Sequence, residues 1–297
     1  MNKVAISASC VWMKMAGLPA WRVRPAGTAK ELFWFVSIFA VLSAAHLSRP
    51  ATAADDCAGR IASWDFHGQS VPPPQQQRFK DKFCREIRNV ERWNAQQHWP
   101  APPSLPRLRI FVSPEFHLAM SLVYLWEGDA GRMEFPADRV VAVQANVAHE
   151  LTHIYLPNGN RMLAEGFASY VQDQIGTNVG YPNFGKDVNR FIRCEMSPDD
   201  RRNINLPRLD QIATPDLLTI GVGLPASQRA YYISSSFVRY LIGTHGMRKF
   251  GLLYARTTFQ PGRRVGRTSD DWTNIYRLSI GDLEQRWKSM IEAVNCS

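Results

Sequence analysis

One short motif in this sequence has the residue types and spacing of a metal site. His149, Glu150 and His153 form the pattern H-E-x-x-H within the apolar-periodic segment NVAHELTHIYL. On a helix, residues i and i+4 share a face, so both imidazoles can reach one ion. Glu150 lies one step around the helix, where its carboxylate can hold a water molecule beside that ion. The motif predicts a zinc site in which Glu150 is the general base.

The third ligand that such a site needs has one candidate. A catalytic zinc ion takes three protein ligands and leaves a fourth position to water. Glu165 lies in the largely apolar segment MLAEGFASYV, where a solvated carboxylate is not expected. The turn formers of Pro157–Asn160 return the chain antiparallel and would bring Glu165 to the face of the two histidines. We therefore expect His149, His153 and Glu165 to bind Zn²⁺.

The segments HELTH and LAEGFASYV together resemble the gluzincin branch of the zinc metallopeptidases. Members of that branch supply two histidines from H-E-x-x-H and a glutamate from a following helix. The E-G-x-A phrase that starts at Glu165 is characteristic of the aminopeptidase side, although the spacer is shorter here and Leu163 stands where a tryptophan is frequent. In these respects the chain resembles a smaller, bacterial-looking group of secreted gluzincin-like proteins. It implies a zincin-like fold, a Zn²⁺ cofactor and hydrolysis of peptide bonds.

A tyrosine in the segment AYYISSSFVRYLIGTHG is a further candidate. In the resembling aminopeptidases a tyrosine opens a comparable helix and stabilises the oxyanion, and Tyr231 fits that register because Tyr240 and Leu241 follow at the matching offsets. Tyr232 does not fit it. A phenol O–H aimed at the developing charge would lower the barrier. We expect Tyr231 to be catalytic, and the alternative is that both tyrosines pack in the core.

Two other functions stay open. Gly131–Phe135 resembles the G-x-M-E-N strand through whose glutamate aminopeptidases bind the substrate α-amine, but Phe135 replaces the asparagine. Glu134 would then be an amine anchor and the protein an aminopeptidase; otherwise it is an ordinary strand-end charge. The other alternative is a non-catalytic, zinc-containing module that binds at the cell envelope. Glu150 argues against that module, because a structural zinc site does not need a base.

Periodicity predicts the elements that must position these residues. Apolar residues at three- and four-residue steps predict a helix over Phe79–Trp93, and alternation predicts strands at Leu108–Val112, Ser121–Trp126 and Arg139–Gln144. Helical periodicity then dominates, with helices expected over 146–156, 162–174, 184–194, 227–243, 246–257 and 280–293.

This order predicts an α+β fold: an N-terminal mixed sheet with the active-site helix, followed by a mostly helical C-terminal part. We expect a signal peptide at 1–53, an N-terminal helical extension at 54–106 and a zincin-like metallopeptidase domain at 107–297.

The first segment has the order of a secretory signal. Basic residues precede the apolar run Leu32–Ala45, and the small residues Ala51–Ala53 follow it. The run is shorter than the roughly 20 residues of a spanning helix. We expect a secreted or periplasmic protein with no stable membrane span after cleavage; an uncleaved anchor facing outside is the alternative. Removing residues 1–53 lowers the formal net charge from +9 to +4, because they carry six basic and one acidic residue. We expect a peptide or protein substrate and no nucleic acid.

Four cysteines remain after such cleavage, an even number in a chain bound for an oxidising compartment. They are Cys57, Cys84, Cys194 and Cys296. Three pairings are possible, and the sequence favours Cys57 with Cys84, which closes a short loop, and Cys194 with Cys296. A cysteine zinc site is not expected, because no C-x-x-C spacing occurs.

Overall fold

The computed structural model describes residues 55–99, 107–117, 119–127, 130–177, 185–211, 224–257 and 269–297. All of them lie in the unit Arg49–Ser297. The predicted signal peptide at 1–53 lies outside the described residues.

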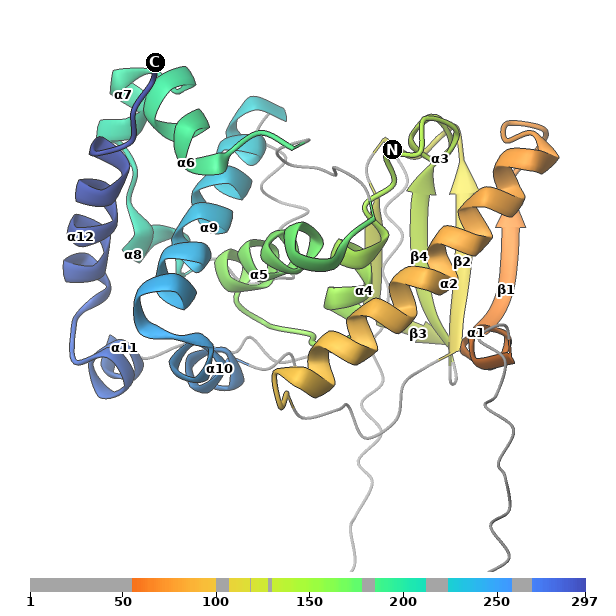
Figure 1. Cartoon of the computed structure of the whole chain (residues 1–297), viewed down its shortest axis with the longest axis horizontal. Coiled ribbons are helices and arrows are strands. Elements are labelled where there is room, and N and C mark those ends of the chain that lie inside the picture. Colours follow the sequence, from red (N-terminus) through yellow and green to blue (C-terminus); the bar gives the residue numbers. More distant parts are fainter. Residues whose placement is uncertain are drawn as a thin grey trace, which may run out of the picture. The chain divides into compact units, whose positions relative to one another are not determined.

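Four strands form one mixed sheet in the order β1-β2-β4-β3 (Figure 1). Strands β1 (Ile61–Phe66), β2 (Arg107–Ser113) and β4 (Ala130–Pro136) are parallel, whereas β3 (Met120–Glu127) pairs antiparallel with β4 at the edge. The predicted strands at Leu108 and Ser121 are confirmed. The sequence did not indicate strand β1. The region 54–106 was expected to be a helical extension, but its strand β1 pairs with β2 in the same sheet.

The predicted strand at Arg139–Gln144 is wrong. This stretch starts inside the short helix α3 (Ala137–Val141) and ends in a turn where Val143 has a φ of 59°. Pro136 precedes the helix with the φ that a proline ring imposes, and Val140 is buried at helical spacing from Ala137. The β-branched residues suggested a strand, but the sheet uses β4, immediately upstream.

One face of the sheet packs against a long helix, α2 (Pro73–Gln96), which crosses it in Figure 1 and confirms the helix predicted over Phe79–Trp93. Phe79 and Phe83 of α2 contact Phe135 of β4 at ring-centroid distances of 5.3 and 6.1 Å. Alternate residues of the strands point the other way. There Arg132 stacks its guanidinium 4.0 Å from the ring centroid of Phe111. The core therefore lies on the α2 side, and the opposite face carries charged side chains.

Helices follow the sheet, as expected for this mixed α and β chain. The site is built from α4 (Val147–Tyr155), α5 (Arg161–Ile175) and α9 (Leu224–His245). The remaining helices are α1 (Asp55–Arg60), α6 (Val188–Arg190), the π-helix η1 (Phe191–Glu195), α7 (Pro198–Arg202), α8 (Leu206–Leu209), α10 (Met247–Ala255), α11 (Ser269–Tyr276) and α12 (Ile280–Glu292).

The turn between α4 and α5 is held by two buried asparagines. Asn160 caps α5 by accepting a hydrogen bond from the backbone N–H of Leu163, and its amide donates to Asp210. Asn158 donates to the carbonyl of Tyr254 at 2.8 Å. These hydrogen bonds hold the backbone of the turn in one conformation. The turn therefore sets the angle between α4 and the following helix α5.

Two disulfides confirm the favoured pairing. Cys57 bonds to Cys84 and joins α1 to α2, and Cys194 bonds to Cys296 and joins η1 to the C-terminal segment. The second bond closes a loop between residues 102 positions apart. Within the described ranges, no helix combines the length and the apolar character that crossing a membrane requires.

Candidate metal centre

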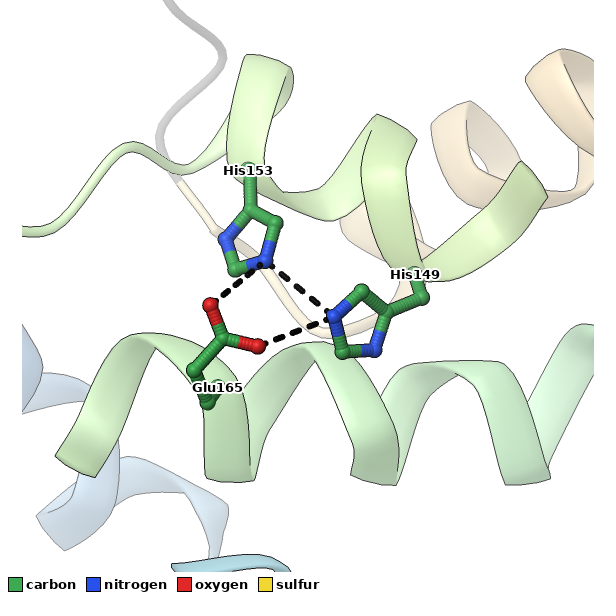
Figure 2. A group of neighbouring side chains, drawn as sticks. All are labelled: His149, His153 and Glu165. Carbon is green, nitrogen blue, oxygen red and sulfur yellow. Dashed lines mark hydrogen bonds and ion pairs between the residues drawn. The ribbon is translucent and has the colours of Figure 1, made fainter. Parts of the chain in front are cut away.

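Helix α4 carries both histidines of the motif on the face turned toward α5. Its other positions are core: Val147, Ala148 and Leu151 are completely buried. Because one helical turn separates His149 from His153, both imidazoles project in the same direction (Figure 2). The apolar residues thus fix the rotation of α4, and that rotation aims the histidines at α5.

The three predicted ligands converge on one point (Figure 2). Nε2 of His149 lies 3.2 Å from Nε2 of His153 and 3.1 Å from Oε2 of Glu165. Nε2 of His153 lies 3.3 Å from Oε1 of Glu165. Ligand atoms held about 2.0–2.1 Å from a tetrahedral zinc ion lie about 3.3 Å from one another. The two histidine nitrogens, and each nitrogen with its nearer carboxylate oxygen, are therefore spaced like neighbouring ligands of one zinc ion.

The site is largely closed to solvent and holds a charged carboxylate. The side chains of His149 and Glu165 are only 3% and 5% exposed. Burial alone would raise the pKa of Glu165, but the charges of Arg161 and His153 and hydrogen bonds from both histidines hold that pKa well below its usual range. Glu165 is thus an ionised carboxylate and a candidate ligand for a cation.

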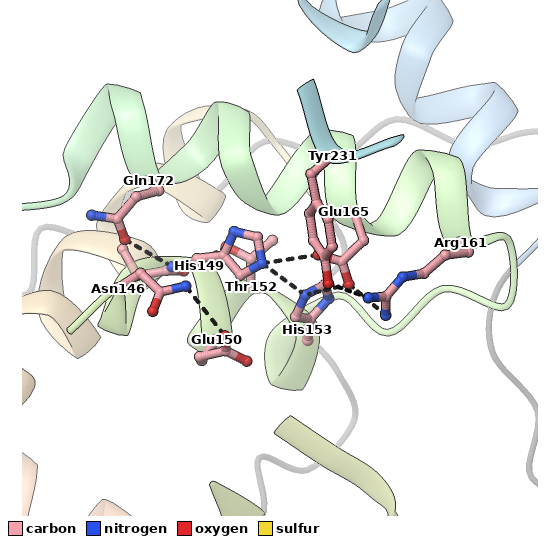
Figure 3. Close-up of polar contacts among 10 residues, drawn as sticks. Asn146, His149, Glu150, Thr152, His153, Arg161, Glu165, Gln172 and Tyr231 are labelled. Atoms are coloured by element: carbon pink, nitrogen blue, oxygen red, sulfur yellow. Dashed lines mark hydrogen bonds and ion pairs between the residues drawn. The ribbon is translucent and has the colours of Figure 1, made fainter. Parts of the chain in front are cut away.

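Glu150 lies on the neighbouring face of α4 and is also buried. Its Oε1 accepts a hydrogen bond from Nδ2 of Asn146 at 3.3 Å (Figure 3). Asn146 precedes Glu150 by one helical turn, so the contact is a local helical pair. Its carboxylate is not one of the three converging donors, which leaves its oxygens outside the predicted ligand set.

Tyr231 reaches the same site from α9. Its hydroxyl accepts a hydrogen bond from Nη2 of Arg161, and Nη1 of the same guanidinium pairs with Glu165 (Figure 3). Tyr232, the neighbour that does not fit the register, is instead buried and stacks on Phe191 at a centroid distance of 3.8 Å. The structure therefore links Tyr231, and not Tyr232, to Glu165 through Arg161.

A glycine explains how α9 comes so close to α5. A Cβ atom on Gly166 would lie 2.4 Å from the carbonyl oxygen of Ser234 and 2.6 Å from the side chain of Val238. No other residue fits at that distance without moving the helices. The glycine of the E-G-x-A phrase thus permits the helix contact that places Tyr231 near Glu165.

The N-terminus of α4 is anchored by side chains from two other helices. Oε2 of Glu86, on α2, accepts a hydrogen bond from the backbone N–H of Ala148 at 2.6 Å. Oε1 of Gln172, on α5, accepts one from the backbone N–H of His149 at 3.0 Å. The first N–H groups of a helix have no partner within it, so these contacts both satisfy and position the start of α4.

Sequence reasoning missed four of these polar residues. Asn146 and Arg161 each precede a motif glutamate by one helical turn, a spacing that could have identified them. Glu86 and Gln172 carry no comparable signal, because their partners on α4 are distant in the sequence.

Glu134, the candidate amine anchor, lies on β4 and not among the converging donors of the described residues. It is buried, and Oε1 accepts a hydrogen bond from Nε of Arg132 at 2.6 Å. Because it alternates with Phe135, it points to the sheet face opposite α2. A substrate amine at this carboxylate would have to compete with Arg132.

In comparisons with protein families, with curated proteins and with solved structures, nothing matches this chain.

Proposed function

We propose that the protein is a zinc-dependent metallopeptidase with a zincin-like arrangement of its site. The observation that carries the proposal is the convergence of His149, His153 and Glu165. The two Nε2 atoms lie 3.2 Å apart, and each lies 3.1–3.3 Å from one oxygen of the carboxylate. Two imidazoles and one carboxylate suit zinc, because Mg²⁺ and Ca²⁺ prefer sites made of oxygen alone. The order of a sheet with an antiparallel edge strand, then α4, then α5 also supports the zincin-like part.

The site's own residues divide the chemistry among them. His149, His153 and Glu165 would hold the ion, which polarises the scissile carbonyl and activates a water molecule. Glu150 takes the proton from the attacking water and passes it to the leaving amine. Asn146 orients Glu150 through the hydrogen bond at 3.3 Å. Tyr231 donates its hydroxyl proton to the carbonyl oxygen as negative charge develops there.

We further propose that the protein works outside the cytoplasm. Both disulfides support an oxidising compartment, and the segment 1–53 has the order of a cleaved signal. The amino-terminal sequence of the protein recovered outside the cytoplasm tests this, since cleavage after Ala53 or Ala54 is expected.

A glutamate-to-glutamine pair of variants tests the hydrolase proposal. Glu150→Gln removes the base and keeps the shape, so we expect unchanged zinc content and a fall in peptide hydrolysis of about 10²–10⁴-fold. Glu284→Gln is the matched control: Glu284 is also buried, but it lies on α12, where it accepts from the backbone N–H of Leu206. The control should bind zinc and cleave a mixed peptide pool like the parent protein.

The other results distinguish the alternatives. Zinc in the parent protein and in Glu150→Gln, without cleavage of any peptide by either, would contradict the hydrolase and favour the zinc-containing binding module. Absence of zinc from both would contradict the metal site. Cleavage of peptides with free amino termini, but not of blocked ones, would favour the aminopeptidase and a role for Glu134.

A further inference from the structure

Arg161 occupies a place at the site that the proposed chemistry does not use. It is the first residue of α5, one helical turn before Glu165, and Nη1 lies 2.6 Å from Oε1 of that carboxylate. Its side chain is 19% exposed, so the ion pair is largely buried. The same carboxylate oxygen also faces His153. Arg161 therefore contacts the carboxylate on the side where it meets the second histidine.

The other terminal nitrogen of the guanidinium contacts a residue from a different helix. Nη2 of Arg161 donates a hydrogen bond to the hydroxyl of Tyr231, whose ring centroid lies 5.2 Å from the guanidinium carbon (Figure 3). A guanidinium has donors only, so the phenol oxygen accepts here and the phenol proton is not used in this contact. One planar group thus links a candidate metal ligand on α5 to the candidate oxyanion donor on α9.

The rigidity of this group matters more than its charge alone. The nitrogens of a guanidinium are fixed in one plane, whereas a lysine ammonium is a single point on a flexible stem. When Arg161 holds Glu165 with one nitrogen and Tyr231 with another, the relative position of the two oxygens is set by covalent geometry. A lysine could replace one of these contacts, but not both together.

We propose that Arg161 is a positioning residue of the metal centre that fixes the Glu165 carboxylate and the Tyr231 hydroxyl relative to each other. The part of this inference that concerns Tyr231 in catalysis rests on the proposed peptidase function. The part that concerns Glu165 rests only on zinc binding, and it is measured without any turnover.

Two substitutions at Arg161 separate its two contacts. Arg161→Gln removes the charge and the two-point contact, so we expect zinc affinity, measured by competition with a chromogenic chelator, to fall about 10–100-fold. Arg161→Lys retains a cation for Glu165, so zinc affinity should recover to within about 3-fold of the parent protein. In Arg161→Lys, kcat should still fall at least about 10-fold with little change in KM, because Tyr231 is no longer oriented.

Arg239 provides the matched control. It lies on α9 and forms an ion pair with Asp173 of α5, so its guanidinium also joins these two helices, two helical turns beyond Glu165 along α5. Arg239→Gln should leave zinc affinity and kcat within about 2-fold of the parent protein. If both Arg161→Gln and Arg239→Gln lowered zinc affinity equally, Arg161 would act only through helix packing and the proposal would be overturned.

A double-mutant cycle tests the link to Tyr231. Tyr231→Phe alone is expected to lower kcat about 10²-fold, as the loss of an oxyanion donor does. If Arg161 acts through this hydroxyl, Arg161→Gln combined with Tyr231→Phe should be no worse than the more damaged single variant. Single effects that multiply in the double variant, to about 10³-fold or more, would show independent roles and overturn the link.

The zinc measurement keeps the two proposals distinguishable. A parent protein that binds zinc and cleaves nothing would contradict the peptidase function, while the zinc affinities of Arg161→Gln and Arg161→Lys would still decide the role of Arg161 at Glu165. Unchanged zinc affinity in Arg161→Gln, in a folded protein that binds zinc, overturns that role.

Discussion

Two polar clusters meet on helix α4, and they differ in the atoms that face one another. The clamp cluster consists of the buried Lys82 and Glu86 and the exposed Thr177 at the N-terminus of the helix. Glu86 is fully buried and accepts hydrogen bonds from the backbone N–H groups of Ala148 and Thr177, while Lys82 donates to the carbonyl of Ala145 at 2.5 Å. The ligand triad of His149, His153 and Glu165 faces its donor atoms toward one another at 3.1–3.3 Å.

The kinds of atom that meet distinguish the structural cluster from the candidate metal site. In the clamp cluster, donors from Lys82 and from the backbone meet acceptors, so the protein itself completes the arrangement. Burial lowers the pKa of Lys82, and the neighbouring charge of Glu86 opposes that effect. In the ligand triad, atoms that bind metals converge on one point. A zinc ion bound there would be coordinated by all three residues, which is the basis of the proposed metal site.

The largest effect on folding is expected in the clamp cluster. Glu86→Ala leaves Lys82 without its countercharge, at a side-chain exposure of 5%, and removes the acceptor for two backbone N–H groups. We expect the free energy of unfolding, measured with urea, to fall by about 3–5 kcal/mol. Asp81→Ala on the same helix is the control. Asp81 is exposed and accepts a hydrogen bond from Nε2 of Gln77, so a loss of about 1 kcal/mol or less is expected.

Zinc should stabilise the folded protein through the ligand triad. At free zinc about 100 times its Kd, the gain is about 2.7 kcal/mol, which corresponds to a rise in Tm of about 5–10 °C. Differential scanning calorimetry with zinc and with a chelator measures it. His153→Ala should abolish the rise, whereas His67→Ala, at an exposed position, should retain it. An equal rise in both variants would contradict zinc binding by the triad.

An intermediate loss of stability is expected when the contact between α5 and α9 is disturbed. Gly166→Ala forces a methyl group against the carbonyl of Ser234, so we expect a loss of about 1–3 kcal/mol in the free energy of unfolding and a lower kcat as Tyr231 shifts. Gly243→Ala on α9 meets no atom within 4 Å and should be neutral or stabilising by about 0.5–1 kcal/mol. Equal stability of the two variants would contradict the close approach of these helices.

The smallest effect on stability is expected at the C-terminal end of α4, where the neutral hydroxyl of Tyr254 forms a hydrogen bond. Tyr254 is buried and donates its hydroxyl to the carbonyl of Leu156 at 2.8 Å, and burial, followed by the charge of Glu165, raises its pKa. The unfolded chain ionises this phenol near pH 10. The stabilisation is therefore complete below about pH 10 and is lost as the pH rises further.

Tyr254→Phe separates the two contributions of this phenol. Because the variant lacks this hydrogen bond, its free energy of unfolding at pH 7 should be lower by about 1 kcal/mol. Between pH 10 and pH 11.5, urea unfolding should show a shallower fall in stability than for the parent protein. An unchanged alkaline slope would assign the loss to other groups.

The features that depend on near neighbours in the chain could be predicted before the structure was known. The H-E-x-x-H spacing required His149 and His153 to share a helix face, because helical geometry is local. The apolar surroundings of Glu165 indicated its burial, and the short turn before α5 indicated its return to the histidines. The favoured disulfide pairing and helix α2 followed from a short loop and from apolar periodicity.

Tertiary structure alone decided the rest. The β-branched stretch at Arg139–Gln144 was expected to be a strand, but packing formed α3 there, while β1 became a strand by pairing with β2. Glu86 reached α4 from α2, and Tyr231 reached Arg161 from α9. Residues so far apart in the sequence carry no shared periodicity. Their contacts exist because the helices pack around one core, and that packing depends on the whole set of buried side chains rather than on any local pattern.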